Sequence, residues 1–144
     1  MDRKFGKIIS FLYRKSQVYL GTALKKYDLT AAEQPFLSVL QAFPGATQEE
    51  ISSQLQIDKA ATARTVASLE DKGYIERFQD EQDKRQNRVF LTAKAKRYWS
   101  GIEKELYAWN ALLTKNIDTP ILDTAYTVLL QMEKNITAAK ETEL

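Results

Sequence analysis

The sequence predicts a mainly α-helical fold with a small β-hairpin wing, built as a winged helix-turn-helix lobe between helices from both ends of the chain. Two capped helical segments follow each other between residues 47 and 73, and two short apolar runs then bracket a polar loop. Long amphipathic segments precede and follow this middle part. Two helices joined by a tight turn and followed by a hairpin form the arrangement that lays one helix in a DNA groove.

The first two helices are predicted from apolar spacing and from capping residues. Apolar side chains recur every three or four residues over residues 3–26, which indicates an amphipathic helix. Thr30 and Glu33 have the spacing of a capping box, and they predict a second helix that ends at Pro44. Pro35 would lie inside this second helix, where it lacks an N–H donor and is expected to bend the helix.

The helix-turn-helix pair is predicted from its caps. Thr47 begins another capping box and opens a short third helix. Residues 56–58 form the turn, and Asp58 is a good N-cap for a fourth helix that ends at Gly73. The apolar side of the fourth helix is expected to pack on the third helix, which leaves its opposite side free.

The wing and the last two helices follow. Residues 74–78 and 88–91 alternate as strands, and Thr92 can cap the next helix. Apolar residues then recur at near-heptad spacing over residues 99–113 and again over 122–136. Seams of this kind need helical partners.

The 144 residues suit a single domain, with the lobe at residues 29–92 and dimerisation helices at 1–28 and 93–144. One chain of this size has little core with which to cover three long apolar stripes. A homodimer interface is therefore favoured over a self-contained bundle.

Composition argues against several classes of protein. The chain has no cysteine and no histidine, so disulfides, thiol nucleophiles and histidine metal ligands are excluded. Its five glycines lie far apart and form no phosphate-binding loop. These absences argue against an enzyme and predict no cofactor and no metal site. No apolar run approaches the roughly 18 residues of a membrane span, and no signal-peptide pattern appears, so a cytoplasmic protein is expected.

The distribution of charge weighs mildly against DNA binding. The net charge is +2, but residues 47–92 carry seven Lys or Arg against nine Asp or Glu, a balance of −2. Attraction to DNA must therefore come from basic side chains gathered on one face, with the acids turned elsewhere.

Candidate base-reading residues lie on the free side of the fourth helix, whose N-terminal half meets base edges in a helix-turn-helix. Arg64 can donate two hydrogen bonds to guanine, and alanines suit contact with thymine methyl groups. Near the start of the third helix, Gln48 can hold a phosphate together with the free helix amides. The candidates on these two helices are Gln48, Lys59, Ala60, Ala61, Arg64 and Ser68.

The polar loop of the hairpin carries an arginine where a purely structural turn prefers Asn-Gly or Asp-Gly. Arg85 beside a carboxylate is preorganised to enter a narrow minor groove, with Asp83 as the expected orienting partner. The alternatives are an amphipathic surface helix with a solvated Arg64, and a surface ion pair of little energetic value. The hairpin directly after the helix pair favours the DNA-binding interpretation.

The chain around the hairpin resembles the winged-helix signature of the MarR family of bacterial and archaeal transcription regulators. The matching residues are Asp83, Arg85, Arg88, Val89, Leu91 and Thr92, preceded by the stretch LEDKGYIER at residues 69–77. Leu29 and Thr30 at the start of the second helix fit the family too, and the similarity covers nearly the whole chain. Through this resemblance Arg88 joins Asp83 and Arg85 as a wing candidate for DNA contact.

The resemblance implies a homodimer that binds pseudo-palindromic double-stranded DNA, most often as a repressor, and that a small anionic aromatic effector releases. By position, Arg14 on the first helix and Tyr107 on the fifth would meet such a ligand, although packing or solvation explains both residues equally well.

The chain departs from the family pattern in two ways. Ala60, Ala61 and Ala63 stand where small hydroxyl residues are frequent, so fewer base contacts are expected. The acidic balance of the middle segment is the second departure. Both features support an alternative function, a winged-helix protein-interaction module that does not bind DNA.

Overall fold

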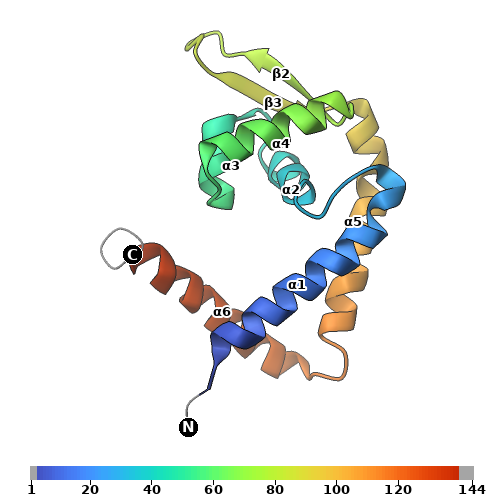
Figure 1. Ribbon diagram of the computed structural model, residues 1–144, viewed down its shortest axis with the longest axis vertical. Helices are drawn as coiled ribbons and strands as arrows, with labels where there is room; N and C mark the ends of the chain where they lie inside the picture. Colours follow the sequence, from blue (N-terminus) through green and yellow to red (C-terminus); the bar gives the residue numbers. More distant parts are fainter. Residues whose placement is uncertain (1–2, 140–144) are drawn as a thin grey trace. The chain divides into compact units, whose positions relative to one another are not determined.

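The computed structural model describes residues 3–139, and their secondary structure is the predicted combination of long helices with a small antiparallel sheet (Figure 1). In chain order the elements are α1 (Phe5–Ala23), the 3-10 helix η1 (Lys25–Tyr27), α2 (Gln34–Ala42), β1 (Ala46–Thr47), α3 (Gln48–Leu55), α4 (Lys59–Asp71), β2 (Ile75–Gln79), β3 (Asn87–Leu91), α5 (Ala93–Leu113) and α6 (Thr119–Ala139). The chain divides into two compact units after Trp109. Within the described residues, no helix is both long enough and apolar enough to cross a membrane.

The start of α2 corrects one prediction. The capping box forms, since the Thr30 N–H donates to Glu33 Oε1 at 2.9 Å and the Glu33 N–H donates to Thr30 Oγ1 at 3.1 Å. The α-helix, however, begins only at Gln34, so Pro35 is its second residue. In the first turn an N–H has no partner within the helix, and a missing N–H costs nothing there. The predicted bend at Pro35 was therefore wrong.

The helix-turn-helix pair is confirmed with its caps. Thr47 Oγ1 accepts the Glu50 N–H at 3.1 Å, and Asp58 Oδ1 accepts the Ala61 N–H at 2.7 Å. Gln56, between the two helices, has a φ of +54°, which ends α3 abruptly and turns the chain toward α4. Gly73, with a φ of +80°, follows the last turn of α4.

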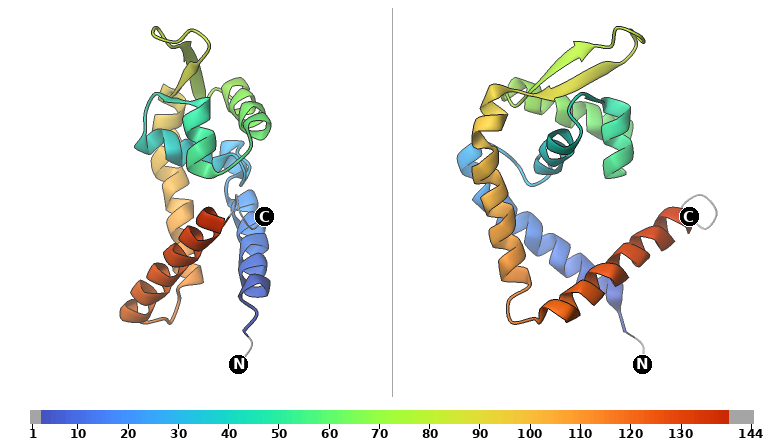
Figure 2. Two further views of the ribbon diagram at one scale, coloured as in Figure 1. Left: turned by 90° about the vertical axis from the view of Figure 1, so that its left-hand side faces the viewer. Right: turned by 180° about the vertical axis from the view of Figure 1, so that it is seen from behind.

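The sheet contains one strand that the sequence did not predict. The strand order is β1-β3-β2, and β2 pairs antiparallel with β3 from Ile75 opposite Leu91 to Gln79 opposite Asn87. Two residues before α3 form β1, in which Ala46 lies opposite Val89. The loop between β2 and β3 stands clear of the helices in both views of Figure 2.

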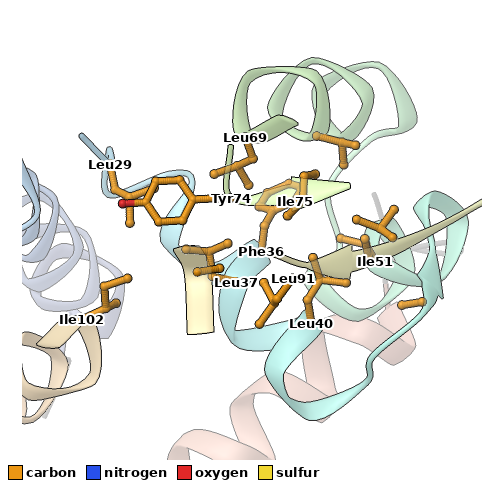
Figure 3. Packing of buried hydrophobic residues seen from close by; sticks show 14 of the residues in the cluster. Leu29, Phe36, Leu37, Leu40, Ile51, Leu69, Tyr74, Ile75, Leu91 and Ile102 are labelled. Atoms are coloured by element: carbon orange, nitrogen blue, oxygen red, sulfur yellow. The ribbon is translucent and has the colours of Figure 1, made fainter. Parts of the chain in front are cut away.

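The core of the lobe lies between the sheet and the helices that flank it (Figure 3). Its largest fully buried side chains include Tyr74, Phe36, Leu37, Leu40, Ile51 and Leu69. Fully burying one Leu, Ile or Phe side chain stabilises a fold by about 1.5–3 kcal/mol. The predicted inward side of α4 is confirmed, since Thr62, Val66 and Leu69 are all buried.

The first half of α5 belongs to this core, which corrects the assignment of its whole apolar seam to a partner. Ile102 is fully buried in the same cluster as Leu24, and Trp99 packs against that cluster. Only the later part of the seam, represented by Leu113, remains exposed. The near-heptad spacing therefore marks a buried side of α5, and it does not distinguish contacts within the chain from contacts with a partner.

The helices α1 and α6 have no buried residue along their described lengths. The exposed large apolar side chains on α1 are Phe5, Ile8, Ile9, Phe11, Leu12, Tyr13 and Val18. Those on α6, in the second unit, are Ile121, Tyr126, Val128, Leu129, Leu130 and Ile136. Exposed apolar surface on this scale marks an interaction site.

Gly101 on α5 is expected to be intolerant of any side chain. A Cβ at this position would overlap the hydroxyl of Tyr27 and lie 2.9 Å from its Cζ. Tyr27 is held in place, because its ring packs on Tyr98 and its carbonyl oxygen accepts a hydrogen bond from the Tyr74 hydroxyl. Although alanine has the higher helix propensity, we expect Gly101→Ala to lower the free energy of unfolding by about 1–3 kcal/mol through overpacking.

Urea denaturation followed by circular dichroism measures this difference. The control is Gly21→Ala on α1, where a new Cβ meets no described atom within 4 Å. That variant should be neutral or slightly stabilised. Equal stability of the two variants would contradict the proposed contact between Tyr27 and Gly101.

Candidate nucleic-acid interface

The free side of α4 presents a small-residue surface with one long cation. Lys59, Ala60 and Arg64 are exposed, and Ala61 is half-buried beside them. Within residues 3–139, the guanidinium of Arg64 has neither an ion pair nor a hydrogen bond. Because its neighbours on this side are alanines, Arg64 extends beyond them with all five N–H donors available.

The structure brings three of the predicted residues to one hollow of about 270 Å³. Gln48 at the start of α3, Lys59 at the start of α4 and Arg85 in the hairpin loop all line it. Its other lining residues are Thr47, Glu49, Gln86 and Asn87. Two cations and several amides around a polar hollow suit the phosphate and sugar of a DNA backbone, and Glu49 is the one acid among them.

At the tip of the wing the predicted ion pair is present. Arg85 Nε and Nη2 donate to the Asp83 carboxylate at 3.1 and 3.3 Å, and the Arg85 N–H donates to Asp83 Oδ1 at 3.1 Å. These hydrogen bonds from Arg85 lower the pKa of Asp83 below its usual value. The Arg85 side chain is nevertheless 90% exposed. Asp83 therefore orients the guanidinium of Arg85 through one edge and leaves the side chain accessible.

Arg88 is turned back toward the lobe. Its Nη1 donates to the carbonyl oxygen of Gly45 at 2.9 Å, and its Nη2 lies 3.1 Å from Asp80 Oδ2. These contacts join β3 to the turn before β1 and to the end of β2. They occupy part of the guanidinium and hold the wing in place.

A further arginine, which the sequence analysis missed, supports Gln48. Arg77 on β2 donates to both carboxylate oxygens of Glu70 on α4, at 2.7 and 3.1 Å, and to Gln48 Oε1 at 3.2 Å. The hydrogen bonds from Arg77 lower the pKa of Glu70. This chain of contacts links α3, α4 and β2. The alternation of the strand, which turns Arg77 toward the same face as Ile75, was the available signal.

The remaining predicted residues lie apart from this surface. The Ser68 hydroxyl is half-buried and donates to Glu33 Oε2 at 2.7 Å, so it faces α2 and does not join Arg64. Arg14 on α1 and Tyr107 on α5 are both exposed. Neither side chain takes part in a hydrogen bond or ion pair with the described residues, and their role as ligand contacts stays a prediction.

The contacts of the acidic residues explain how a segment of net negative charge can present a basic face. Glu70, Asp80 and Asp83 each form an ion pair with an arginine of the same segment. Asp58 caps α4. Four of the nine acids are therefore engaged within the lobe, which leaves the exposed Lys59 and Arg64 without a close carboxylate partner among the described residues.

Asp83→Ala is expected to reduce the preference for a specific site while leaving affinity for random DNA unchanged or higher. Without its partner, Arg85 must lose rotamer freedom on binding, which weakens specific binding by about two- to tenfold. Removing a carboxylate also makes the wing more positive, which strengthens contact with any DNA backbone. Titration of a selected site and of random duplex measures both effects.

Glu81→Ala is the matched control, because it removes an exposed acid of the same loop that forms neither a hydrogen bond nor an ion pair with Arg85 among residues 3–139. It should strengthen binding to both DNAs without changing their ratio. The same loss of preference in both variants would show that charge alone, and not orientation of Arg85, determines the result.

A sequence model described as the MarR family matches residues 29–86. The HTH-type transcriptional regulator BilQ of Clostridioides difficile (strain CD3) is 30% identical over 139 residues, which cover 94% of this chain and 91% of that protein. The uncharacterized HTH-type transcriptional regulator YybA of Bacillus subtilis (strain 168) is 27% identical and covers 78% of this chain and 75% of that protein.

Solved structures of MarR proteins are similar to this chain as well. A MarR transcriptional regulator from Methanosarcina mazei Go1 is 35% identical, with a TM-score of 0.85 over 92% of this chain and 96% of that chain. A mutant MarR from E. coli, crystallised as a complex with operator DNA, is 26% identical, with a TM-score of 0.81 over 88% of this chain and 91% of that one.

Proposed function

Because the chain belongs to the MarR family of helix-turn-helix transcriptional regulators, we propose that it represses transcription by binding a pseudo-palindromic operator as a homodimer. In this proposal residues 29–92 form the DNA-binding lobe, and the dimerisation helices lie within residues 1–28 and 93–144, although the first half of α5 packs in the core of the lobe. The observation that carries this proposal is the polar hollow shared by the starts of α3 and α4 and the wing tip, together with an exposed Arg64 on α4.

In this proposal the contacts with DNA divide by type. Arg64, Ala60 and Ala61 read base edges in the major groove, because they lie in the N-terminal half of α4, with Ala60 and Arg64 exposed and Ala61 half-buried. Lys59 and Gln48 bind the phosphate backbone across the hollow. At the wing tip, Arg85 enters the minor groove, oriented by Asp83 and with Arg88 holding the wing.

The exposed apolar sides of α1 and α6 support the homodimer. Neither helix has a buried residue along its described length, and each carries large apolar side chains. Two copies of the chain related by a two-fold axis would cover both helices at once. Such a dimer presents two α4 helices to one side of the DNA, so the half-sites should lie about one helical turn apart.

A small anionic aromatic effector completes the proposal. Arg14 supplies a guanidinium and Tyr107 a phenol that form neither a hydrogen bond nor an ion pair within residues 3–139, and both residues are exposed. An effector bound to them would release the operator and relieve repression. The protein then needs no metal, no cofactor and no catalytic step, and it acts in the cytoplasm, where its DNA lies.

Selection of bound fragments from genomic DNA tests the proposed function. The expected result is enrichment of one inverted-repeat sequence by the native protein. Retention of DNA without any enrichment would overturn the operator proposal. No salt-dependent retention on any duplex would favour a winged-helix module that binds proteins instead.

A further inference from the structure

A buried carboxylate joins the start of α2 to the C-terminal half of α4, about one to two helical turns beyond Arg64. Glu33 is 5% exposed. Its Oε1 accepts from Lys72 Nζ at 2.8 Å and from the Thr30 N–H at 2.9 Å, and its Oε2 accepts from the Ser68 hydroxyl at 2.7 Å. Both carboxylate oxygens are therefore occupied, and two of the three donors come from α4 or its C-cap.

Lys72, the C-cap of α4, is tied to two further segments. Its Nζ also donates to the carbonyl oxygen of Asp28, between η1 and α2, at 2.8 Å. Its own carbonyl oxygen accepts from Lys94 Nζ of α5 at 2.6 Å. The Lys94 ammonium lies 4.7 Å from the ring centre of buried Tyr74. The end of α4 is thus connected to the segment after α1, to α2 and to α5.

The contacts of Glu33 determine its charge state. Burial alone raises the pKa of Glu33, but the hydrogen bonds from Lys72, the Thr30 N–H and Ser68 outweigh it and hold the pKa below its usual value. The carboxylate is therefore ionised in the folded protein at neutral pH. An ion pair removed from water often contributes little net stability, while its geometry is strict.

The contacts of Glu33 with Ser68 and Lys72 lie on α4 where a small tilt of the helix would displace Arg64. Lys72 lies eight residues beyond Arg64, which is about 12 Å along a helix axis. Tilting α4 by about 5° at its C-terminal end would move the Cα of Arg64 by about 1 Å, enough to spoil a hydrogen bond to a base. Contacts with phosphates, through long and flexible side chains, tolerate such a shift better.

We propose that Glu33, with Ser68 and Lys72 as its donors, is a positioning residue that sets the direction of α4 and thereby determines operator specificity. This inference rests on the proposed function. It assigns Ser68 a role through Glu33 rather than a direct contact with DNA. It also predicts that specificity can be lost by a change far from the DNA, with affinity for random sequence retained.

The test compares Glu33→Gln and Ser68→Ala with the native protein on a selected operator and on random duplex, at two salt concentrations. Glu33→Gln keeps the size of the side chain and removes its charge, and Ser68→Ala removes only one donor. We expect Glu33→Gln to weaken operator binding about tenfold or more while changing random-duplex binding less than about twofold. Ser68→Ala should show a smaller change of the same kind.

The double variant separates positioning from direct contact. If Ser68 acts through Glu33, adding Ser68→Ala to Glu33→Gln should cause no further loss, because coupled residues are not additive. Additive losses would instead show that Ser68 touches DNA by itself, and would overturn its assignment here. Lys72→Arg keeps the positive charge and should retain more of the preference for the operator over random duplex than Lys72→Met does.

A second salt bridge in the same part of the molecule supplies the control. Lys26 Nζ lies 2.6 Å from Glu105 Oε1, and this pair does not involve α4. Lys26→Met should leave both affinities unchanged. Circular dichroism of every variant, including Ser68→Ala, tests whether the variant is folded.

The outcomes distinguish this inference from the proposed function. A native protein without any preference for an inverted repeat would refute the operator proposal itself. A native preference that Glu33→Gln preserves would refute only the positioning role. Equal losses of operator and random-duplex binding would also refute it, because a general loss of structure, not a change in direction, would then be responsible.

Discussion

Replacing Leu129 by aspartate is expected to abolish the dimer and, with it, operator binding. Leu129 is 54% exposed in the chain by itself, on a helix with no buried residue in its described length. In the proposed homodimer this side chain is covered, and a two-fold axis places the substitution in the interface twice. Each copy would lose about 1.5–3 kcal/mol of apolar burial and introduce an unpaired charge.

Sedimentation at micromolar concentration measures the result. The Leu129→Asp variant should sediment as a monomer or aggregate, whereas the native protein should be dimeric. Gln131→Asp is the control, since it adds the same charge on the polar side of α6 near Lys134. A native protein that is a well-folded monomer at this concentration would overturn the dimer.

Arg64→Ala and Arg85→Ala are expected to reduce operator binding in two different ways. Arg64→Ala should cost about 1–3 kcal/mol and relax the preference at one position in each half-site, because a bidentate contact with guanine is lost. Arg85→Ala should weaken binding through lost charge and reduced sensitivity to groove width, with the major-groove preference kept.

Binding to the selected site and to its single-base variants, at two salt concentrations, separates the two roles. Arg85→Ala should reduce the salt dependence of binding, because a cation near the DNA backbone is lost, whereas Arg64→Ala should mainly change the discrimination between single-base variants. Lys84→Ala removes a neighbouring charge in the same loop and shows how much of the Arg85 effect is charge alone. If neither Arg64→Ala nor Arg85→Ala changes operator binding, the proposal that α4 and the wing contact DNA is wrong.

The parts of the fold predicted from sequence depend on chemistry within a few residues. Thr47, Asp58 and Thr92 each cap the helix expected of them, because a side-chain oxygen next to a free amide acts locally. The hairpin followed from alternation in the same way. Asp83 and Arg85 are two residues apart, so their contact was also within reach of the sequence.

The features that sequence reasoning missed depend on residues far apart in the chain. The assignment of Arg88 to DNA, made on a resemblance, stays a prediction, but the sequence did not indicate its hydrogen bond to Gly45, which lies 43 residues away. Ser68 was placed on the free side of α4 from a helical wheel, but its partner Glu33 lies 35 residues away. A wheel gives the angle of a side chain around its own helix and contains no information about which neighbour meets it.

Pro35 and Ile102 show the same limit for packing. The capping box was correctly identified, yet α2 begins only at Gln34, directly before Phe36 and Leu37, which are buried in the core. The seam of α5 was correctly identified as apolar, but the sequence did not indicate that Ile102 packs with Leu24 of the same chain. In both cases tertiary contacts determined the outcome.

The short strand β1 has a consequence for which insertions this protein can tolerate. Thr47 is at once the last residue of β1, opposite Arg88, and the N-cap of α3. Adding or removing one residue between Phe43 and Ala46 would shift the register of β1 against β3 by one position, or draw the cap away from α3. Relatives should therefore differ in the length of the loop at the wing tip. The connection between α2 and α3, residues 43–47 here, should keep a constant length.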